Sequence, residues 1–397
     1  KSHTISTVVE NCTISCPPIT KLEKPMAALV LHYDQSESNF SGFTSVTQPS
    51  MALPHGLDIK AVKKIVVLLS PSFYKQRCRF YEGTPNIETR PLLFQWSDLT
   101  ASQIKGLMRI EAEDTAPLYM GVILDLLRQF QRDDELPAFS EFMSALKDPR
   151  SKQFLNSQST PLRQRLELLE SFVADSDRNK DLPSVSLADV VQSGTVVIAD
   201  LTDPLLSPAE ANGVFHILVE SFRSLSIDCG RLLCMDEAHK YLSRDSGDLA
   251  KTVVDVVRQM RHFGIRVAIS TQSPLVLPAE LLELVSVAVV HQFQSRDWLA
   301  YLGSKLPLRN KHFREILTLE PGSALVYCSR THTSPRENAS GDDFAGESDE
   351  DFDAQGQGPK SEIASGPDFG ESQMKPKLIR LQIRKRLTRD SGASVVN

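Results

Sequence analysis

Two adjacent carboxylates, Asp236 and Glu237, directly follow the apolar run Leu-Leu-Cys-Met at residues 232–235. Such a run predicts a buried strand, and the ligands of parallel α/β sheets bind where the strands end. A carboxylate at that place can help to hold Mg²⁺ on a phosphate chain, and its neighbour can orient or deprotonate an attacking water. Because an Asp-Glu pair also begins ordinary loops, the pair alone leaves the catalytic and the loop interpretations equally open.

A second strand end follows further along the chain. Residues 265–269 are apolar apart from Arg266, and they run into Ser-Thr-Gln-Ser-Pro at 270–274. A polar amide such as Gln272 at the tip of a neighbouring strand can sense a γ-phosphate or position water, although Ser, Gln and Pro also suit a plain loop. Arg261, between the two strands, either reaches developing phosphate charge or is merely favoured near the end of its helix.

Three segments together resemble the HerA/FtsK group of RecA-like P-loop ATPases. They read LLCMDEAHKYL, RQMRHFGIRVAISTQSP and LTLEPGSALVY. In that group, a Walker B strand ends in Asp-Glu, a helix ends in Arg-x-x-Gly, the next strand ends in a sensor Gln followed by Pro, and a late strand joins the sheet. The resemblance covers residues 190–330 well and residues 20–110 more weakly, and it is absent from the helical block between them and from the acidic segment near the C-terminus.

The resemblance implies Mg²⁺-dependent ATP hydrolysis, coupled to the translocation of double-stranded DNA by a homo-oligomeric ring. It implies that Asp236 assists Mg²⁺, that Glu237 polarises the attacking water and that Gln272 senses the γ-phosphate. Arg261 would be the arginine finger offered to the neighbouring subunit, although Arg258 and Arg266 lie close by and keep that choice open.

A phosphate-binding loop has to precede these elements, yet no G-x-x-x-x-G-K-[ST] motif occurs in the 397 residues. The opening Lys-Ser-His-Thr-Ile resembles the last two residues of that motif running into their helix. By this resemblance Lys1 would contact the β- and γ-phosphates of ATP, and the Ser2 hydroxyl would bind Mg²⁺ together with Asp236. We therefore expect the first strand and the glycine loop upstream of Lys1. Since that loop supplies the N–H groups that surround the phosphates, we expect this chain alone to bind nucleotide poorly.

The order of apolar runs and amphipathic segments predicts an α/β fold with a mostly parallel sheet flanked by helices, which the resemblance specifies as RecA-like. Strands that are apolar on both faces and separated by helices are typical of such a sheet. We expect strands at 26–33, 63–70, 91–96, 195–200, 231–236, 265–270, 286–293 and 324–328. We expect helices at 3–11, 102–112, 117–132, 138–147, 161–174, 207–226, 246–263 and 278–284.

Five segments divide the chain. Residues 1–100 are expected to form the N-terminal part of the ATPase core, 101–190 a helical insertion, and 191–330 the rest of the core with the Walker B strand and the sensor. Residues 331–375 contain eleven acidic and three basic residues among many Gly, Ser and Pro. They bury too little apolar surface to fold, so we expect a disordered acidic segment. Residues 376–397, with a net charge of +5, form a basic C-terminal strand and tail, whose basic face is either simply exposed or contacts phosphates.

The overall composition excludes several classes of protein. An apolar content of 41% and a net charge of −6 exclude a wholly disordered chain and a uniformly basic nucleic-acid coat. No run of 18 apolar residues and no signal peptide occur, so we expect no membrane partner and an intracellular location, cytoplasmic or nuclear. The six cysteines form no C-x-x-C pair, which favours reduced thiols over a zinc site.

Three other interpretations are weaker or remain open. Asp-Glu-Ala-His at 236–239 also marks a helicase superfamily, but too little chain follows Gln272 for the second RecA-like domain that such helicases need. No G-x-S-x-G or H-E-x-x-H motif supports a hydrolase, and His239 fits a Walker B neighbour better than a ligand or a base. A non-catalytic ATPase-like scaffold or interaction protein stays open, although Asp236 and Glu237 keep the catalytic residue types.

Overall fold

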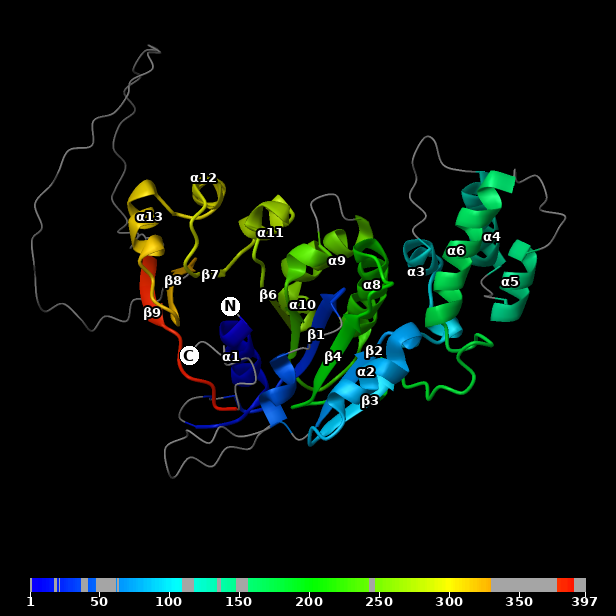
Figure 1. Cartoon of the computed structure of the whole chain (residues 1–397), viewed down its shortest axis with the longest axis horizontal. Helices are drawn as coiled ribbons and strands as arrows, with labels where there is room; N and C mark the ends of the chain where they lie inside the picture. Colours follow the sequence, from blue (N-terminus) through cyan, green and yellow to red (C-terminus); the bar gives the residue numbers. More distant parts are fainter. Residues whose placement is uncertain are drawn as a thin grey trace, which may run out of the picture.

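The computed structural model describes residues 2–17, 20, 22–36, 42–47, 62, 64–108, 118–133, 137–147, 156–242, 247–329 and 377–388. Lys1 and the acidic segment 331–375, for which we predicted disorder, lie outside the described residues. The described part contains two β-sheets and the helices that cover them (Figure 1).

A parallel sheet of six strands forms the centre of the molecule, in the order β3-β2-β4-β1-β5-β6. Its strands are β1 (Ala27–Asp34), β2 (Ile65–Leu69), β3 (Ile87–Pro91), β4 (Val196–Thr202), β5 (Arg231–Met235) and β6 (Ile265–Ile269). β1, β2, β4 and β5 are buried along their whole length, as expected of strands covered by helices on both sides. The predicted α/β class with a mostly parallel sheet is confirmed.

Alternate residues of the central strands pack against two different helical layers, because successive side chains of a strand point to opposite faces. Ala28 of β1 belongs to the apolar cluster of α1 (Ser2–Thr13). Leu29 belongs to the cluster of α8 (Pro208–Ser224) and α9 (Gly247–Arg258) on the other face. The sheet therefore needs α1 on one face as much as α8 and α9 on the other.

A smaller antiparallel sheet follows, in the order β7-β8-β9. Its strands are β7 (Val287–Val290), β8 (Ser323–Cys328) and β9 (Lys377–Gln382), and β9 comes from the basic C-terminal segment. Helices α12 (Arg296–Gly303) and α13 (Asn310–Leu317) form an apolar cluster with β7 and β8 and cover one face of this sheet.

Helices also occupy the chain between β3 and β4. They are α3 (Ala101–Leu107), α4 (Leu118–Asp133), α5 (Phe139–Lys147), α6 (Asn156–Phe172) and α7 (Leu187–Val190). Figure 1 shows α3 to α6 on one side of the central sheet and the smaller sheet on the other. Trp96 connects them to the end of β3, since its ring lies 5.1 Å from that of Phe139 and 5.0 Å from that of Phe142. Within the described ranges, none of the helices combines the length and the apolar character that crossing a bilayer requires.

Two of the expected elements differ from the observed ones. The strand expected at 91–96 lies earlier, at β3, because a strand at the sheet edge accommodates the polar Glu, Thr and Arg of β3, whereas the apolar residues 92–94 are buried against the helical layer. The helix expected at 246–263 is interrupted at Gln259, whose angles of φ −107° and ψ 20° separate α9 from the short α10 (Met260–Phe263).

Some helices were not expected from the sequence. α2 (Tyr74–Tyr81), α12 and α13 have eight residues each, which is too short for apolar periodicity to stand out from the surrounding loops. The other predicted elements lie close to their expected bounds, and α11 (Ala279–Glu283) is among them.

Two glycines bring α3 and α8 into close contact. A Cβ built on Gly213 of α8 would lie 3.0 Å from the carbonyl oxygen of Gly106 and 3.4 Å from the Cα of Leu107, both in α3. These neighbours are backbone atoms, which cannot turn aside as a side chain can. Glycine at 213 therefore allows the first helix after β3 to pack directly on the core.

We expect Gly213→Ala to lower the free energy of unfolding by about 1–3 kcal/mol, because overpacking forces the backbone to shift. Gly121→Ala is the matched control, since Gly121 also lies in a helix, α4, but no described atom outside that helix's own backbone lies within 4 Å of its Cβ position. Alanine there should be neutral or stabilising by about 0.5–1 kcal/mol. Urea unfolding of both variants measures the difference, and equal stabilities would contradict the close contact.

Candidate functional site

The carboxyl ends of four neighbouring strands bring polar side chains into one row. In strand order these are Asp200 from β4, His32 and Asp34 from β1, Asp236 and Glu237 after β5, and Ser270 and Gln272 after β6. Because the strands are parallel, all these ends lie at the same edge of the sheet, where α/β proteins bind ligands. Three of the residues proposed from the sequence, namely Asp236, Glu237 and Gln272, lie in this row.

Asp236 is buried at the end of β5, with an exposed fraction of 6%. Its Oδ1 accepts a hydrogen bond from Ser270 Oγ at 2.8 Å, and its Oδ2 lies 3.5 Å from His32 Nδ1. Burial by itself raises the pKa of Asp236, but the contacts with His32 and Ser270 outweigh it and lower the pKa. Burial likewise lowers the pKa of His32, and Asp236 and Asp200 outweigh it and raise the pKa. Asp236 is therefore ionised at neutral pH.

Ser270 fixes both carboxylate residues at once. Its hydroxyl donates to Asp236 and accepts from the backbone N–H of Glu237 at 3.0 Å, and its carbonyl accepts from the N–H of Ala238 at 2.9 Å. Glu237 has the left-handed angles φ 48° and ψ 41°. This conformation costs a residue with a Cβ about 1–2 kcal/mol. The bonds to Ser270 hold Glu237 in it.

The carboxylate of Glu237 lies among polar partners. Gln272 Nε2 donates to both of its oxygens, at 2.8 and 2.6 Å. His239 Nε2 and Lys240 Nζ lie 3.8 and 3.9 Å from Glu237 Oε2, and Lys240 also donates to Asp34 Oδ2 at 2.7 Å. The Glu237 side chain keeps an exposed fraction of 16%, so that it is oriented by the protein and still accessible to water.

Helix α1 begins at the same edge of the sheet. At its C-terminal end, the N–H of Met26, just before β1, donates to the carbonyl of Cys12 at 2.8 Å. α1 packs along β1 and β5 and therefore runs from the carboxyl edge of the sheet to the amino edge. In its first turn, Thr4 Oγ1 lies 2.9 Å from Nε2 of His291, the residue that follows β7. The positive end of the helix dipole thus lies at the edge that carries Asp236.

The chemistry of this edge suits a phosphate group with bound Mg²⁺. Asp236 offers an ionised oxygen, and Ser2, the exposed first residue of α1, offers a hydroxyl. The N-terminus of α1 favours the negative phosphate. Mg²⁺ usually keeps several waters and takes few protein ligands, so it does not need a cluster of three His, Cys, Asp or Glu side chains, and the described residues contain none. Lys1 lies outside the described residues, and its contact with the phosphates stays a prediction.

Arg261 does not join this cluster. It is exposed in α10, just before Gly264, whose left-handed φ of 62° ends the helix and leads into β6. The start of β6 lies at the amino edge of the sheet, opposite to Glu237, so Arg261 lies away from the cluster within this chain. The alternative Arg258 is engaged by Glu280.

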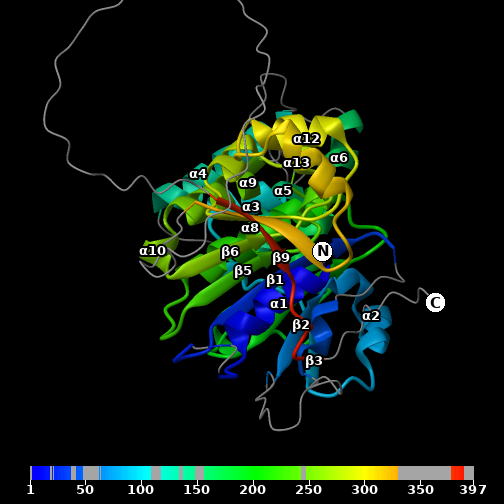
Figure 2. The same cartoon turned by 90° about the vertical axis from the view of Figure 1, so that its left-hand side faces the viewer.

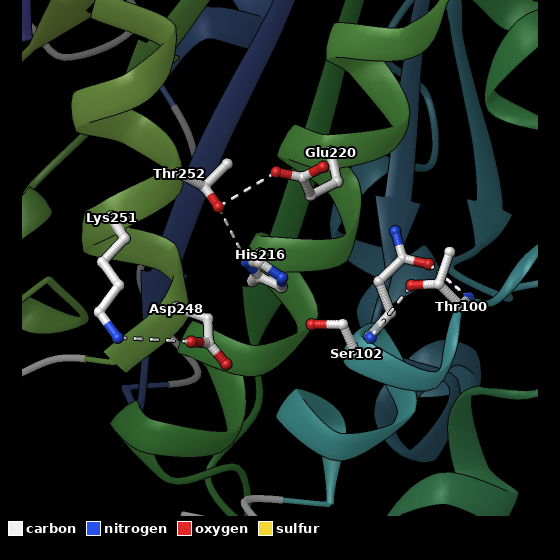
Figure 3. A pocket seen from close by; sticks show the side chains of 8 residues that line it. Thr100, Ser102, His216, Glu220, Asp248, Lys251 and Thr252 are labelled. Carbon is white, nitrogen blue, oxygen red and sulfur yellow. Dashed lines mark hydrogen bonds and ion pairs between the residues drawn. The ribbon is translucent and has the colours of Figure 1, made fainter. Parts of the chain in front are cut away.

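A separate polar hollow of about 290 Å³ lies between α3, α8 and α9 (Figure 3). Thr252 Oγ1 donates to Glu220 Oε1 at 3.1 Å and lies 3.3 Å from His216 Nδ1, and burial lowers the pKa of His216 despite the nearby Asp248 and Glu220. The lining residues are Thr100, Ser102, Gln103, His216, Glu220, Asp248, Lys251 and Thr252, and none of them is a predicted site residue. The carboxylates of Glu220 and Asp248 in this hollow would repel phosphates, so we do not place a nucleotide there.

His32, Asp34 and Ser270 belong to the row, but we did not single them out from the sequence. Asp34 carried the same signal as Asp236, a polar residue at the end of an apolar run. His32 gave none, because the pairing of β1 with β4, which sets His32 opposite Asp200, is a property of the folded sheet. Ser270 carries no signal of its own within the Ser-Thr-Gln-Ser-Pro segment, where only the amide of Gln272 points to phosphate chemistry.

Comparisons with known proteins give distant likenesses only. No family model matches the chain, and no curated protein matches it. The genome packaging NTPase B204 from Sulfolobus turreted icosahedral virus 2, in complex with sulfate, is 18% identical with a TM-score of 0.30, over 38% of this chain and 68% of that chain. VirB4 of Thermoanaerobacter pseudethanolicus is 12% identical with a TM-score of 0.42, over 78% of this chain and 90% of that one. The bacterial conjugative coupling protein TrwB is 14% identical with a TM-score of 0.43, over 76% and 75%.

We expect Ser270→Ala to lower the free energy of unfolding by about 1–3 kcal/mol at pH 7, because it leaves the buried Asp236 carboxylate without its hydroxyl donor. Because the pKa of Asp236 is lowered, its ionised carboxylate stabilises the fold at pH values above its ordinary pKa, and this stabilisation is lost as the pH falls through the folded-state pKa. The difference in the free energy of unfolding between the parent and Ser270→Ala should therefore become smaller toward pH 3.

Urea unfolding at pH 7 and at pH 3 measures this difference. Ser224→Ala is the control, because the exposed Ser224 hydroxyl donates only to the carbonyl of Ser221 at the end of α8. A loss in Ser270→Ala that is no greater than in Ser224→Ala would show that Ser270 does not hold the two carboxylates.

Proposed function

We propose that this chain is the greater part of a P-loop ATPase domain of the HerA/FtsK type, which hydrolyses ATP with Mg²⁺. The observation that carries the proposal is the joining of Asp236, Glu237 and Gln272 at one sheet edge, with the N-terminus of α1 at that edge. An anion-attracting helix end, an ionised buried carboxylate and an accessible oriented carboxylate are what phosphate transfer to water requires.

Each residue has a role that follows from its surroundings. Bound Mg²⁺ would neutralise charge on the phosphates, and Asp236 and the Ser2 hydroxyl would hold it. Glu237, oriented by its partners and still accessible to water, would polarise the attacking water. The Gln272 side-chain amide donates its two observed bonds to Glu237, so it is placed to exchange that partner for a γ-phosphate oxygen. Lys1 would contact the β- and γ-phosphates.

Two open sheet edges support a further strand with a glycine loop. Among the described residues, β6 is the last strand of the central sheet and β7 the last strand of the smaller one. α1 contacts the central sheet through β5 and the smaller sheet through the pair Thr4 and His291. The exposed fractions of Val287 and Val289 on β7 are 56% and 40%. Apolar strands with free edges are prone to pair with another strand. A strand that pairs with both edges would end beside the N-terminus of α1, where a phosphate loop belongs.

The proposal also includes a homo-oligomer of this chain and a polymer on which it acts. Since Arg261 lies at the sheet edge opposite to Glu237, an arginine finger requires a second copy of the chain, as in a homo-oligomeric ring. Double-stranded DNA is the polymer to test first, because the motif resemblance is to DNA-translocating rings. The alternative is a non-catalytic scaffold, and the next experiment distinguishes it from an ATPase.

In the full-length protein, Glu237→Gln should lower kcat for ATP hydrolysis by about 10²–10⁴-fold, because it removes the group that polarises water. Binding of ATP should persist, since the amide keeps the size of the side chain and removes a negative charge near the γ-phosphate. Phosphate release and equilibrium binding of a fluorescent ATP analogue measure the two effects. Asp228→Asn, at an exposed carboxylate that pairs with Lys24, is the control. A full-length parent protein that neither binds nor hydrolyses ATP would establish the scaffold interpretation.

The added strand has its own test. Backbone amides of β6 and β7 should exchange with deuterium more slowly in the full-length protein than in this chain, because the strand would supply hydrogen-bond partners to both free edges. The amides of β4, which pairs on both sides with β1 and β2, serve as the internal control. Unchanged exchange in β6 and β7 would rule out a strand at these edges.

A further inference from the structure

A short stretch of the basic C-terminal segment, residues 383–388, lies along α1 and is here named the strap. The carbonyl oxygen of Arg384 contacts His3 Nε2 at 3.0 Å, near the start of α1. The guanidinium of Arg384 donates to Asn11 Oδ1 at 2.8 Å, near the end of α1. Figure 2 shows the strap running beside α1 after β9. The strap thus joins the two ends of the described chain.

Glu10 of α1 is the centre of this contact. Its side chain has an exposed fraction of 0%. Its carboxylate accepts from Arg384 Nη1 at 3.0 Å, from Arg386 Nε at 3.3 Å, and from the N–H groups of Leu387 and Thr388 at 3.1 and 3.0 Å. The Thr388 hydroxyl donates to it as well. A buried carboxylate is stable only with such partners, so α1 and the strap depend on each other.

The strap also connects α1 to both sheets. It follows β9 directly, and its first residue, Ile383, donates its N–H to the carbonyl of Gly322 at 2.8 Å beside β8. Its Leu387 is buried in the apolar cluster of α1, together with Ile5 and Val9. α1 is therefore clamped between the central sheet and a segment that lies more than 370 residues away in the sequence.

We propose that the strap positions α1 for nucleotide binding and that Glu10 is the positioning residue. This inference rests on the proposed function, because it concerns the same phosphate site. A helix is stiff, and Ser2 lies about 12 Å along the axis from Glu10 at about 1.5 Å per residue. A small tilt of α1 at Glu10 therefore moves Ser2 and the helix N-terminus away from the phosphates and weakens the binding of the nucleotide, while Glu237 and Gln272 on the sheet stay in place. The contacts of the strap described above are with α1 and Gly322, so the strap acts through α1.

The first experiment measures the clamp itself in this chain, without nucleotide. In Glu10→Gln, the backbone amides of α1 should exchange with deuterium at least about tenfold faster, because local opening no longer breaks a buried ion pair. Asp200→Asn is the matched control, since Asp200 is also fully buried and accepts from Arg77 Nε at 3.0 Å and from the Thr202 hydroxyl at 2.6 Å. The control should leave exchange in α1 unchanged. Unchanged exchange in Glu10→Gln, or equal acceleration in both variants, would overturn the proposal.

The second experiment measures the consequence in the full-length protein. Glu10→Gln should raise the KM for Mg–ATP and the Kd of a fluorescent ATP analogue by about tenfold while kcat at saturating ATP changes by less than about twofold, because the reacting groups stay intact. Arg386→Lys, which keeps the charge, should fall between parent and Glu10→Gln. If the parent binds ATP and Glu10→Gln binds it equally well, the positioning role is wrong and the proposed function stands. If the parent binds no ATP, the proposed function fails and the positioning role falls with it.

Discussion

The parallel pairing of β5 with β6 is the constraint on which the site depends. Met235 and Ile269 are partners in this register, so the next residues, Asp236 and Ser270, leave the sheet side by side. Ser270 can then bond to Asp236 and to the N–H of Glu237, which keeps its strained left-handed backbone. A slip of one residue would turn every side chain of β6 to the opposite face and separate these groups.

Two buried carboxylates connect segments that are distant in the sequence. Asp200 connects β4 to Arg77 of α2, and Glu10 connects α1 to the strap. In both cases an arginine and a hydroxyl replace the water that the carboxylate gave up, so that burial does not leave an unpaired charge. Such pairs add little net stability compared with apolar packing, but losing one partner is costly. They therefore specify which segments meet.

The sequence predicted the central strands and the Asp236–Glu237–Gln272 arrangement, because apolar runs that end in polar residues carry a local signal. It placed the strand at 91–96 too late, because β3 is a polar edge strand without that signal. It did not predict His32, the αL conformation of Glu237 or the strap. Each of these depends on residues distant in sequence: the pairing of β1 with β4, the hydroxyl of Ser270, and the contact of Glu10 with Arg384. Local patterns determine elements, and long-range pairing determines which side chains meet.

The most direct test is a structure, with Mg²⁺ and a non-hydrolysable ATP analogue, of the protein that includes the proposed upstream strand and glycine loop. The phosphates should lie at the N-terminus of α1, with the metal near Asp236 and Ser2 and the γ-phosphate within reach of Gln272 and Glu237. A nucleotide bound elsewhere, as in the hollow between α3, α8 and α9, or no nucleotide bound at saturating concentration, would show that the sheet edge is not the ATP site.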